Sequence, residues 1–568
     1  MLARSEIDAL FPPDLPDPGH WEQRYPPRQL PDGALVTRLG PSPTGSPHIG
    51  HIYQAMIDLD VARRSSGRYL VRIEDTDTAR EVGGVIGQFK RAFEYFGLEP
   101  DEEEGRGEYG PYRQSARSAI YLSHARELLR EGKAYLCFDT PDELAAARIA
   151  QQAAKVPTGY YGSWATWRDA SDADVRARIA ENVPHVVRFR SPGLQGRRAE
   201  FSDAIRGTLS AEDNYNDVVI LKSAAGLAVG RQGQPGAPAP ADGRLPTYHF
   251  AHAVDDHLMR VNLVIRAEEW LPSVPMHLQL FAALGFEPPG YAHTSQLMKQ
   301  IPGGKRKLSK RKDPEASVDF YLSAGYPAKA VLFYLRGLAN GPLAELPLEE
   351  ALAAPIEISL LGGAGPLIDQ VKLEDISADH IATLSDQQVL DAMRTWAAEY
   401  DAELVAVLDS NNDLALAALA VERHGVPNPR KDLRKWSDFR DAYGFFFAEL
   451  FSPVNGGDPR LGDLPGDLVL AFARDFADGY LESSDPREWF EQIRHLAAKH
   501  GFAASAKEYK QEPERYPGSI REASQIIRVA LTGSTQSPDL ASVARVLGRD
   551  EVLRRVTALL GKPGGLGS

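Results

Sequence analysis

The chain has 568 residues, which is too long for one hydrophobic core, so about three to five domains are expected. Its hydrophobic content of 43% and charged content of 25% are ordinary for a soluble globular protein, and no run of about 18 apolar residues predicts a membrane span. The net charge of −14 argues against non-specific nucleic-acid binding over the whole surface, but it is compatible with a localised basic face, because salt limits the reach of distant acids to about 10 Å.

The first 33 residues contain seven prolines and no apolar core. We therefore expect an extended arm that could be mobile, not a secretory signal peptide. Cys137 is the only cysteine, which excludes an internal disulfide and a cysteine-cluster zinc site. A single thiol fits a reducing compartment best, so a cytoplasmic protein is expected.

The next segment alternates strands and helices. Residues 34–39 are predicted to form a strand, and residues 48–66 a helix that follows a loop rich in Pro, Gly and Ser. A second strand is predicted at 69–74, and a second helix begins near Val85 and stops at Gly97. The apolar residues that recur at helical spacing are Ile49, Ile52, Met56 and Leu59 in the first helix, and Val85, Phe89, Phe93 and Phe96 in the second. This order is typical of a parallel, doubly wound α/β sheet.

The middle of the chain is mixed, and its end is helical. Strands are predicted at 185–190 and 217–223. Residues 226–246 are rich in Gly, Pro and Ala and are expected to form a flexible surface insertion. Residues 396–568 show helical periodicity. One such apolar face comprises Trp489, Ile493, Leu496 and His500.

The loop from Pro41 to His51 reads PSPTGSPHIGH and leads from a strand into a helix. Helix N-termini attract phosphate, and His48 and His51 share one helix face in the first turn. Their imidazoles can donate hydrogen bonds to a phosphate as its charge builds, and Gly50 leaves bare backbone for a flat base. The alternative is an ordinary strand-to-helix loop with capping residues, which the PSPTG sequence disfavours.

A basic segment from Lys305 to Lys312 reads KRKLSKRK, in which six of eight residues are basic. Like charges so close repel, so the loop is expected to be mobile until an anion such as a triphosphate arrives. Lys310 is the residue predicted to contact the phosphates. A solvated basic run, or a contact to a nucleic-acid backbone, remains the alternative. Together with the His-Ile-Gly-His sequence, the segment indicates a two-sided clamp for ATP.

Two further segments place acids beside an arginine, RIEDTD at 72–77 and VIRAEEW at 264–270. Each is predicted at a strand end, where active sites of open parallel sheets lie. A glutamate can hold an ammonium group and an arginine a carboxylate, which suits an acidic amino acid. The alternatives are a surface turn for the first segment, and a helix start whose arginine pairs with its own acids for the second. For the sequence 255–257 (Asp-Asp-His) we favour a structural role over a metal site, so no metal is expected.

These residues resemble those of glutamyl-tRNA synthetases, which are class I aminoacyl-tRNA synthetases. The matching strings are RLGPSPTGSPHIGH, YLVRIEDTD, GPYRQS, DVVILKS, PTYHFAHAVDDHLM, VIRAEEW, KLSKRK and, near the end, RVALTGSTQSPDL. The resemblance covers residues 35 to about 325 and the C-terminal segment. It implies a Rossmann-like parallel-sheet catalytic domain split by an α+β insertion, a stem-contact domain and an all-α C-terminal anticodon-binding region.

The implied domains are an N-terminal extension (1–33), two Rossmann halves (34–127 and 223–290), an acceptor-stem-binding insertion (128–222), a stem-contact domain with the KLSKR loop (291–395) and the anticodon-binding region (396–568). The positions implied to bind glutamate are Arg38, Leu39, Gly40, Ser42, Glu74, Tyr248, His252 and Arg266. Those implied to bind ATP are His48, Gly50, His51, Glu269, Lys307, Ser309 and Lys310, of which His48, His51 and Lys310 are the catalytic candidates. Gly40 and His252 depart from the family, which often has alanine and asparagine there.

The resemblance implies activation of L-glutamate by ATP to glutamyl-adenylate, then transfer to the 3′ end of tRNA(Glu) with release of AMP and diphosphate. Mg²⁺ is expected with ATP, bound tRNA is expected to promote activation, and neither zinc nor a membrane partner is expected. A monomer is expected. The alternatives are a glutaminyl enzyme, a truncated paralogue that modifies a tRNA base, and a catalytically silent tRNA-binding protein. Discrimination against tRNA(Gln) stays open, as does the role of the basic cluster Arg430, Lys431 and Arg434 in reading an anticodon.

Overall fold

The structure is a computed structural model, and it describes all residues except 1, 78–79, 81, 224–242, 425 and 562–568. The chain forms two compact units. Unit 1 comprises Met1–Phe320 and Leu332–Asp369, and unit 2 comprises Tyr321–Val331 and Gln370–Ser568. Most of the insertion predicted at 226–246 lies outside the described residues. No helix in the described part of the chain is both long enough and apolar enough to cross a membrane.

The N-terminal segment folds into two short helices, α1 (Arg4–Asp8) and α2 (Pro18–Arg24). Ile7 and Phe11 are buried in a core that also contains the apolar face of α5 (Ser118–Arg130). The expectation of an extended arm is therefore wrong, because apolar residues before and between the prolines bury their side chains against the following domain.

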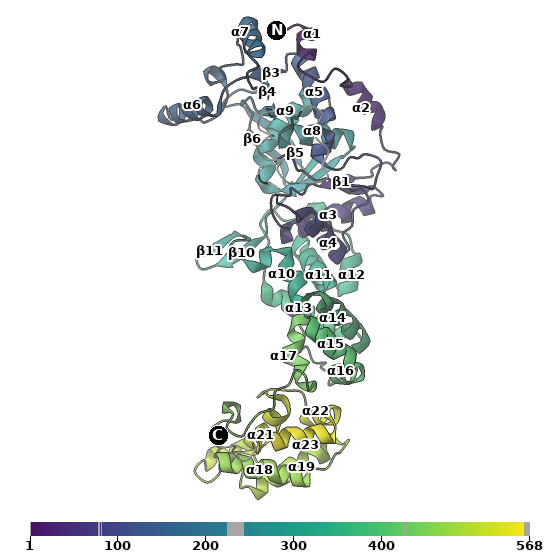
Figure 1. The fold of residues 1–568 in the computed structure, drawn as a ribbon, viewed down its shortest axis with the longest axis vertical. Coiled ribbons are helices and arrows are strands. Elements are labelled where there is room, and N and C mark those ends of the chain that lie inside the picture. Colours follow the sequence, from purple (N-terminus) through teal and green to yellow (C-terminus); the bar gives the residue numbers. More distant parts are fainter. Residues whose placement is uncertain (1, 78–79, 81, 224–242, 425, 562–568) are drawn as a thin grey trace, which may run out of the picture. The chain divides into compact units, whose positions relative to one another are not determined.

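A strand–helix–strand–helix unit follows, as the sequence predicts (Figure 1). β1 (Val36–Leu39) and β2 (Arg68–Val71) pair in parallel, and α3 (Ile49–Arg64) connects them and packs against both. α4 (Val85–Phe96) ends at Gly97, whose φ of 63° is the left-handed conformation that favours glycine. The predicted apolar stripe of α4 is buried and comprises Val85, Phe89, Phe93 and Phe96.

A mixed four-stranded sheet has the order β6-β5-β9-β8. Its strands are β5 (Arg198–Asp203), β6 (Gly207–Glu212), β8 (Leu263–Ala267) and β9 (Gly290–Thr294). β9 is parallel to both β8 and β5, whereas β6 is antiparallel to β5. Asn262 joins this sheet to β1, because its Oδ1 accepts from the Val36 amide at 2.7 Å and its own amide donates to the Val36 carbonyl at 3.2 Å. The parallel α/β core is thus divided between two sheets.

Two helices flank β8 in the sequence and carry or support site residues. α8 (Tyr248–Leu258) precedes the strand, and α9 (Val274–Leu284) leads from it to β9. A 3-10 helix, η5 (Glu268–Ser273), follows β8 directly. α8 and α9 pack against each other, and the apolar residues of both helices are buried in the same core.

A separate antiparallel sheet forms the insertion between the two halves of the parallel core. It comprises β3 (Ala134–Cys137), β4 (Val186–Phe189) and β7 (Val219–Leu221). The last two are shorter versions of the predicted strands. The helices α6 (Pro141–Ala153) and α7 (Asp172–Ala180) belong to the same insertion, and α6 extends outward from β3 and β4 (Figure 1).

The basic segment begins in a strand. β10 (Met298–Ile301) and β11 (Gly304–Lys307) form an antiparallel hairpin that extends to one side of the ribbon, next to α10 (Val318–Ala324) (Figure 1). Gly303 has a φ of 86°, as the tight turn between the two strands requires. Three helices follow, α10 (Val318–Ala324), α11 (Ala328–Ala339) and α12 (Leu348–Ala353).

The described residues of unit 2 form helices and no strands, as predicted for the C-terminal region. The helices after α12 are α13 (Gln370–Thr383), α14 (Asp386–Tyr400), α15 (Ala402–Ser410), α16 (Asn412–Leu419), α17 (Phe439–Tyr443), α18 (Gly466–Gly479), α19 (Pro486–Lys499), α20 (Ala506–Gln511), α21 (Ile520–Thr532), α22 (Leu540–Leu547) and α23 (Arg549–Ala558). Trp489 and Ile493 are buried in the core of this unit, as the helical spacing predicts. His500 lies beside them on Phe472 and contacts Asp475 at 2.8 Å.

Candidate active site

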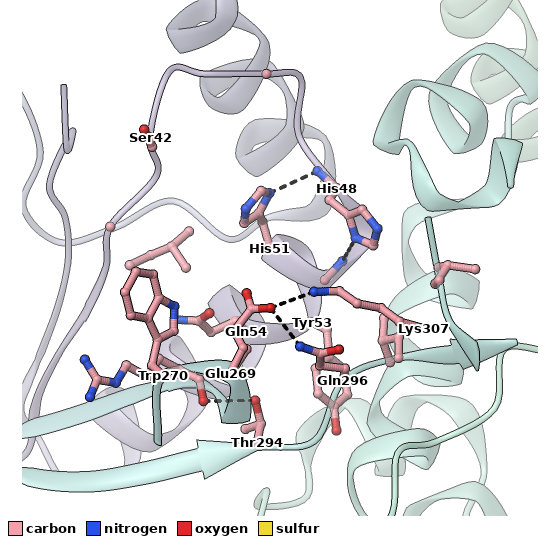
Figure 2. A pocket seen from close by; sticks show the side chains of 18 of the residues that line it. Ser42, His48, His51, Tyr53, Gln54, Glu269, Trp270, Thr294, Gln296 and Lys307 are labelled. Atoms are coloured by element: carbon pink, nitrogen blue, oxygen red, sulfur yellow. Dashed lines mark hydrogen bonds and ion pairs between the residues drawn. The ribbon is translucent and has the colours of Figure 1, made fainter. Parts of the chain in front are cut away.

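A cavity of about 470 Å³ in unit 1 gathers most of the residues that the sequence singled out (Figure 2). Its walls come from the end of β1, the first turns of α3, the start of α8, the end of β8 and the β10–β11 hairpin. The predicted residues that line it are Arg38, Leu39, Gly40, Ser42, His48, Gly50, His51, Glu74, Tyr248, Arg266, Glu269, Lys307 and Lys310. In the described chain, His252 and Ser309 are not among the residues that line it.

Sequence reasoning missed part of the wall. Tyr53 and Gln54 extend the helix face that begins with His48 and His51, and the three-residue step from His51 to Gln54 could have identified the glutamine. Trp270 ends the recognised segment VIRAEEW. The residues that follow β9 carried no signal, because that strand was not predicted. The other unpredicted lining residues are Thr44, Gly45, Ala267, Thr294, Ser295, Gln296, Leu297 and Leu308.

The two histidines cap the first turn of α3 with their own rings. Nδ1 of His48 accepts a hydrogen bond from the Gly50 amide at 2.9 Å, and Nδ1 of His51 accepts from the His48 amide at 3.0 Å. Burial lowers the pKa of His48 to about 4 and that of His51 to about 3, with a further contribution from the charge of Lys310. Both rings are therefore neutral at pH 7, with the proton on Nε2. That N–H is free of the capping bonds. In His51 it can donate to an anion directly, and in His48 an anion would replace the Leu308 carbonyl as its acceptor.

The basic segment is held by acids in its own neighbourhood. Arg306 forms a bidentate ion pair with Asp313, at 2.6 and 2.7 Å. The Ser309 amide donates to the same carboxylate at 2.9 Å, so Ser309 lies in the turn after β11 and away from the cavity. In this arrangement a strand and nearby carboxylates offset the repulsion between the cations. Mobility of the loop before an anion arrives stays a prediction.

Two lysines of this segment reach the rim of the cavity. Lys307 contacts Glu269 at 2.7 Å, and Gln296 donates to the same carboxylate at 2.8 Å (Figure 2). The Lys310 ammonium donates to the carbonyl of Ser46 in the loop before α3. Burial lowers the pKa of Lys310. Both cations thus bridge the hairpin to the opposite wall through contacts that a phosphate group could replace.

At the end of the cavity away from the lysines, carboxylates and arginines form ion pairs with one another. Arg72, fully buried, donates to Asp256 at 2.6 Å and to Glu74 at 3.0 Å. Arg38 contacts Asp256 at 3.5 Å. Burial raises the pKa of Glu74 against the opposing charges of both arginines. A Cβ at Gly40 would lie 2.3 Å from Glu74 Oε1, so glycine at this position leaves room for the carboxylate.

The surface-turn interpretation of RIEDTD does not hold. Asp75 is buried and accepts hydrogen bonds from the Ser115 amide at 2.8 Å and its hydroxyl at 2.7 Å. Arg72 has no exposed surface. The segment is therefore part of the core and fixes the position of Glu74.

Arg266 is a buried cation that lines the cavity and that no carboxylate in the described chain pairs with; the residue is only 3% exposed. Its Nε donates to His293 Nε2 at 3.0 Å, Nη2 lies 3.3 Å from His277 Nδ1, and Nη1 lies 3.5 Å from the Tyr248 hydroxyl. The adjacent acids are engaged elsewhere, because Glu268 pairs with Arg206 at 2.5 Å and Glu269 with Lys307. An arginine paired with its own acids is thus excluded, and the cavity keeps a positive charge.

His252 lies behind the wall. It is fully buried, its Nδ1 is 2.7 Å from Asp256, and its Nε2 is 3.0 Å from the Tyr291 hydroxyl. Its ring also stacks behind Tyr248, with the centroids 6.0 Å apart. Direct contact with a ligand, as predicted, is not supported by this position. Its effect on the cavity passes through Tyr248 and Asp256.

The 255–257 segment is structural, as favoured from the sequence. Asp255 accepts hydrogen bonds from Gln114 at 2.9 Å, Arg117 at 2.7 Å and Tyr121 at 2.7 Å. His257 contacts Glu22 of the N-terminal segment at 2.6 Å. Among the residues that the structure describes, no cluster of three or more His, Cys, Asp or Glu side chains could hold a metal ion.

The basic cluster in unit 2 lies on an irregular segment, so an exposed helix face is excluded. Arg430 pairs with Asp432 at 2.5 Å, and Arg434 pairs with Glu374 at 2.9 Å. Lys431 contacts another acid, Asp379. Its cations are thus partly neutralised, and whether they read an anticodon stays a prediction.

Two family models match the chain. One, described as the catalytic domain of class I tRNA synthetases (E and Q), matches residues 34–226 and 241–353. The other, an anticodon-binding domain, matches residues 508–560. Together they agree with an α/β catalytic part and an all-α C-terminal part.

Curated proteins and solved structures agree with these models. A glutamate–tRNA ligase from Clostridium beijerinckii is 39% identical over 555 residues, covering 95% of this chain and 96% of its own length. One from Thermus thermophilus is 35% identical over 532 residues, covering 93% and 100%. The crystal structure of a glutamate tRNA ligase from Elizabethkingia meningosepticum, in complex with its amino acid, has a TM-score of 0.73 and 26% identity over 93% of this chain and 99% of that one.

The resemblance and fold class predicted from the sequence are thereby confirmed. The cavity lies within the matched catalytic residues, since its lining extends from Arg38 to Lys310. The chain belongs to the class I tRNA synthetases of the glutamyl and glutaminyl type.

Proposed function

We propose that the chain is a glutamate–tRNA ligase. It would activate L-glutamate with ATP to glutamyl-adenylate and transfer the glutamyl group to the 3′ end of tRNA(Glu). The curated relatives, which carry this activity in their names and match nearly the full length, support the reaction. The observation that carries the assignment to this cavity is its polarity, with the buried, carboxylate-free Arg266 at one end and two neutral histidines facing two lysines at the other.

Activation breaks one bond and forms another. An oxygen of the α-carboxylate of glutamate attacks the α-phosphorus of ATP. The bond between the α-phosphorus and the oxygen that bridges it to the β-phosphate breaks, and diphosphate leaves. The Nε2–H groups of His48 and His51 would donate to the phosphate oxygens, and the ammonium of Lys310 would meet the leaving charge. No protein nucleophile is needed, so catalysis rests on positioning and on stabilising charge.

The other residues proposed for ATP surround this end. Gly50 allows the close approach of the His48 ring, because a Cβ there would lie 3.2 Å from Nδ1. Lys307 and Glu269 face each other across the rim and would exchange their ion pair for contacts with the nucleotide. Ser309, which lies off the cavity, would act by shaping the turn that carries Lys310.

The amino acid would occupy the opposite end. Arg266 is proposed to hold the side-chain carboxylate and Glu74 the ammonium group, with Arg38 contributing positive charge. The positions Leu39, Gly40, Ser42 and Tyr248 would form the walls. His252 would support Tyr248 from behind. Glutamine would leave the arginine poorly paired and should be rejected.

The tRNA is proposed to bind outside the cavity. The insertion at 128–222 would contact the acceptor stem, residues 291–395 would form the stem-contact domain, and residues 396–568 would bind the anticodon. The matched anticodon-binding model supports the last assignment in part. In the second step a ribose hydroxyl of the terminal adenosine attacks the adenylate carbonyl, the acyl–phosphate bond breaks, and AMP leaves with the displaced proton passing to solvent.

Mg²⁺ would enter with the triphosphate as part of the substrate. No zinc site is proposed, since Cys137 is hydrogen-bonded to Tyr160 at 3.4 Å and lies 3.7 Å from Asp139 rather than in a cysteine cluster. A monomer in the cytoplasm is proposed from the family and from the single buried thiol.

Exchange of labelled diphosphate into ATP, with and without purified tRNA(Glu), tests the proposal. Glutamate-dependent exchange supports a glutamate–tRNA ligase. Exchange only with glutamine would indicate a glutaminyl enzyme. If tRNA bound but neither amino acid gave exchange, the chain would be a silent tRNA-binding protein and the proposal would be wrong.

A further inference from the structure

Arg266 differs from the other buried arginines around the cavity in what holds it. Arg72 contacts three carboxylates, those of Glu74, Asp255 and Asp256, and Arg38 contacts Asp256. Arg206, next to the cavity, pairs with Glu268. Arg266 instead contacts two imidazoles and a phenol, and no carboxylate in the described chain lies within ion-pair distance of it. Burying an uncompensated charge is costly, so this arrangement needs a reason.

One imidazole is fixed as an acceptor by an acid behind it. His293 Nε2 accepts from Arg266 Nε at 3.0 Å, so its proton must be on Nδ1. That Nδ1–H donates to Asp203 at 2.6 Å. Asp203 is itself held by the amides of Ile205 and Arg206, both at 3.0 Å. The negative charge that could have neutralised Arg266 is thus one ring away from it.

The second imidazole is oriented in the same sense. His277 Nδ1 lies 3.3 Å from Arg266 Nη2, so it is the acceptor and the proton is on Nε2. Nε2 lies 2.9 Å from His249 Nδ1, which must then accept. Burial, followed by the charge of Arg266 among its neighbours, lowers the pKa of His277 well below its ordinary value. The ring is therefore neutral and can accept from the guanidinium.

The hydrogen-bond inventory leaves two donors free. A guanidinium has five N–H groups. In the described chain Nε, one N–H of Nη2 and one N–H of Nη1 have acceptors in His293, His277 and Tyr248. One N–H on each terminal nitrogen has none, and Arg266 lines the cavity. Two parallel N–H groups match a carboxylate in bidentate fashion, whereas a carboxamide offers one acceptor and one donor.

We propose that His277 and His293 are positioning residues that hold Arg266 in place without neutralising it, and thereby set the preference of the cavity for a carboxylate over a carboxamide side chain. A carboxylate at either position would bind the guanidinium equally well but would remove its charge from the substrate. This inference rests on the proposed function, because it names residues that select the amino acid in the same reaction.

A matched pair at position 277 tests it. His277→Gln keeps a neutral acceptor of similar reach, whereas His277→Glu adds a carboxylate. The KM for glutamate in tRNA-dependent diphosphate exchange should rise at least tenfold more in the Glu variant than in the Gln variant. The KM for ATP should agree between the two within about twofold, because position 277 does not line the ATP end. The ratio of kcat/KM for glutamate over glutamine should fall in the Glu variant and stay near wild type in the Gln variant.

Equal glutamate KM values in the two variants, each with a normal KM for ATP, would overturn the inference. If the Glu variant does not fold, as judged by circular dichroism, the pair His293→Gln and His293→Leu replaces it. The Leu variant removes the acceptor and should raise the KM for glutamate about tenfold or more relative to Gln, and equal values would again overturn it. Diphosphate exchange by the wild-type protein separates equal KM values in the variants from failure of the proposed function. If the proposed function is wrong, the wild-type protein shows no glutamate-dependent exchange.

Discussion

Replacement of Arg266 by glutamine removes the positive charge at the amino-acid end of the cavity while keeping a polar side chain of similar length. Two N–H groups of this arginine have no acceptor in the described chain and would meet the substrate carboxylate. Hydrogen bonds to charged groups contribute about 1.5–3 kcal/mol each. Loss of two therefore costs at least about 3 kcal/mol, which corresponds to more than a hundredfold in the apparent affinity for glutamate.

The same substitution should not destabilise the fold. The native arginine is 3% exposed and lacks a carboxylate partner, so its burial carries a desolvation cost that glutamine relieves. Against this, His277 and His293 lose a donor, at about 1–3 kcal/mol for a buried group left unpaired. The midpoint of thermal unfolding is expected to stay within a few degrees of wild type. Function and stability would thus respond differently to one change.

Diphosphate exchange in the presence of tRNA, measured against glutamate and ATP separately, reports the result. The KM for glutamate should rise more than a hundredfold and the KM for ATP should change little. Arg188→Gln is a suitable control, since it removes another buried arginine of unit 1, which lies in β4 and does not line the cavity. An unchanged glutamate KM in Arg266→Gln would refute the assignment of this arginine to the substrate carboxylate.

Three further predictions concern the other groups of the cavity. Lys310→Ala should lower the rate of adenylate formation about 100-fold or more with only a modest loss of tRNA affinity. The reason is that the Lys310 ammonium donates to the Ser46 carbonyl in the loop before α3, where the phosphates are proposed to bind. Gly40→Ala should raise the KM for glutamate about three- to tenfold, because the new Cβ would lie 2.3 Å from Glu74 Oε1 and displace the carboxylate. The free energy of unfolding should fall as pH falls from about 6.5 toward 4, because burial lowers the pKa of His48 to about 4 and that of His51 to about 3, so the unfolded chain binds more protons in this window. The loss should be smaller in His51→Gln.

Each of these has a contrary outcome. A large loss of tRNA affinity in Lys310→Ala, measured by filter binding, would favour the nucleic-acid interpretation of the basic segment. An unchanged glutamate KM in Gly40→Ala would show that Glu74 is not held against the backbone at this position. Denaturant titrations at several pH values test the third prediction, and the same pH dependence in His51→Gln and wild type would contradict the buried, neutral state of this ring.

Local patterns in the sequence were sufficient for the first half of the parallel core. Strand β1, helix α3 and the buried stripe of α4 follow from periodicity and from a glycine that ends the helix. The long-range arrangement was not readable in the same way. β9 pairs with β5, which lies about 90 residues earlier in the sequence, and also with β8. No local pattern in the sequence specifies these pairings.

The N-terminal segment shows a second limit. Prolines and acids suggested an extended arm, but Ile7 and Phe11 bury their side chains against α5. Ile7, Leu10 and Phe11 have helical spacing, but the segment is too short for this spacing to indicate burial. Their burial depends on a surface that is formed by residues more than a hundred positions later.

The residues of the candidate site also differ in whether a local sequence pattern identified them. Residues inside contiguous motifs, such as His48, His51 and Lys310, were found because their chemistry and spacing lie within one segment. His277 and His293 were missed, since each stands alone in the sequence and gains meaning only beside Arg266. Burial of His252 behind Tyr248 was likewise invisible without the packing of α8 against α9.

The central claim is that one cavity holds both the glutamate side chain and the activated phosphate at opposite ends. A crystal structure with a non-hydrolysable glutamyl-adenylate analogue tests it most directly. The side-chain carboxylate should contact both terminal nitrogens of Arg266, and the phosphate should lie within hydrogen-bonding distance of Nε2 of His48 or His51. An analogue bound with its phosphate away from both rings, or with its carboxylate away from Arg266, would contradict the account.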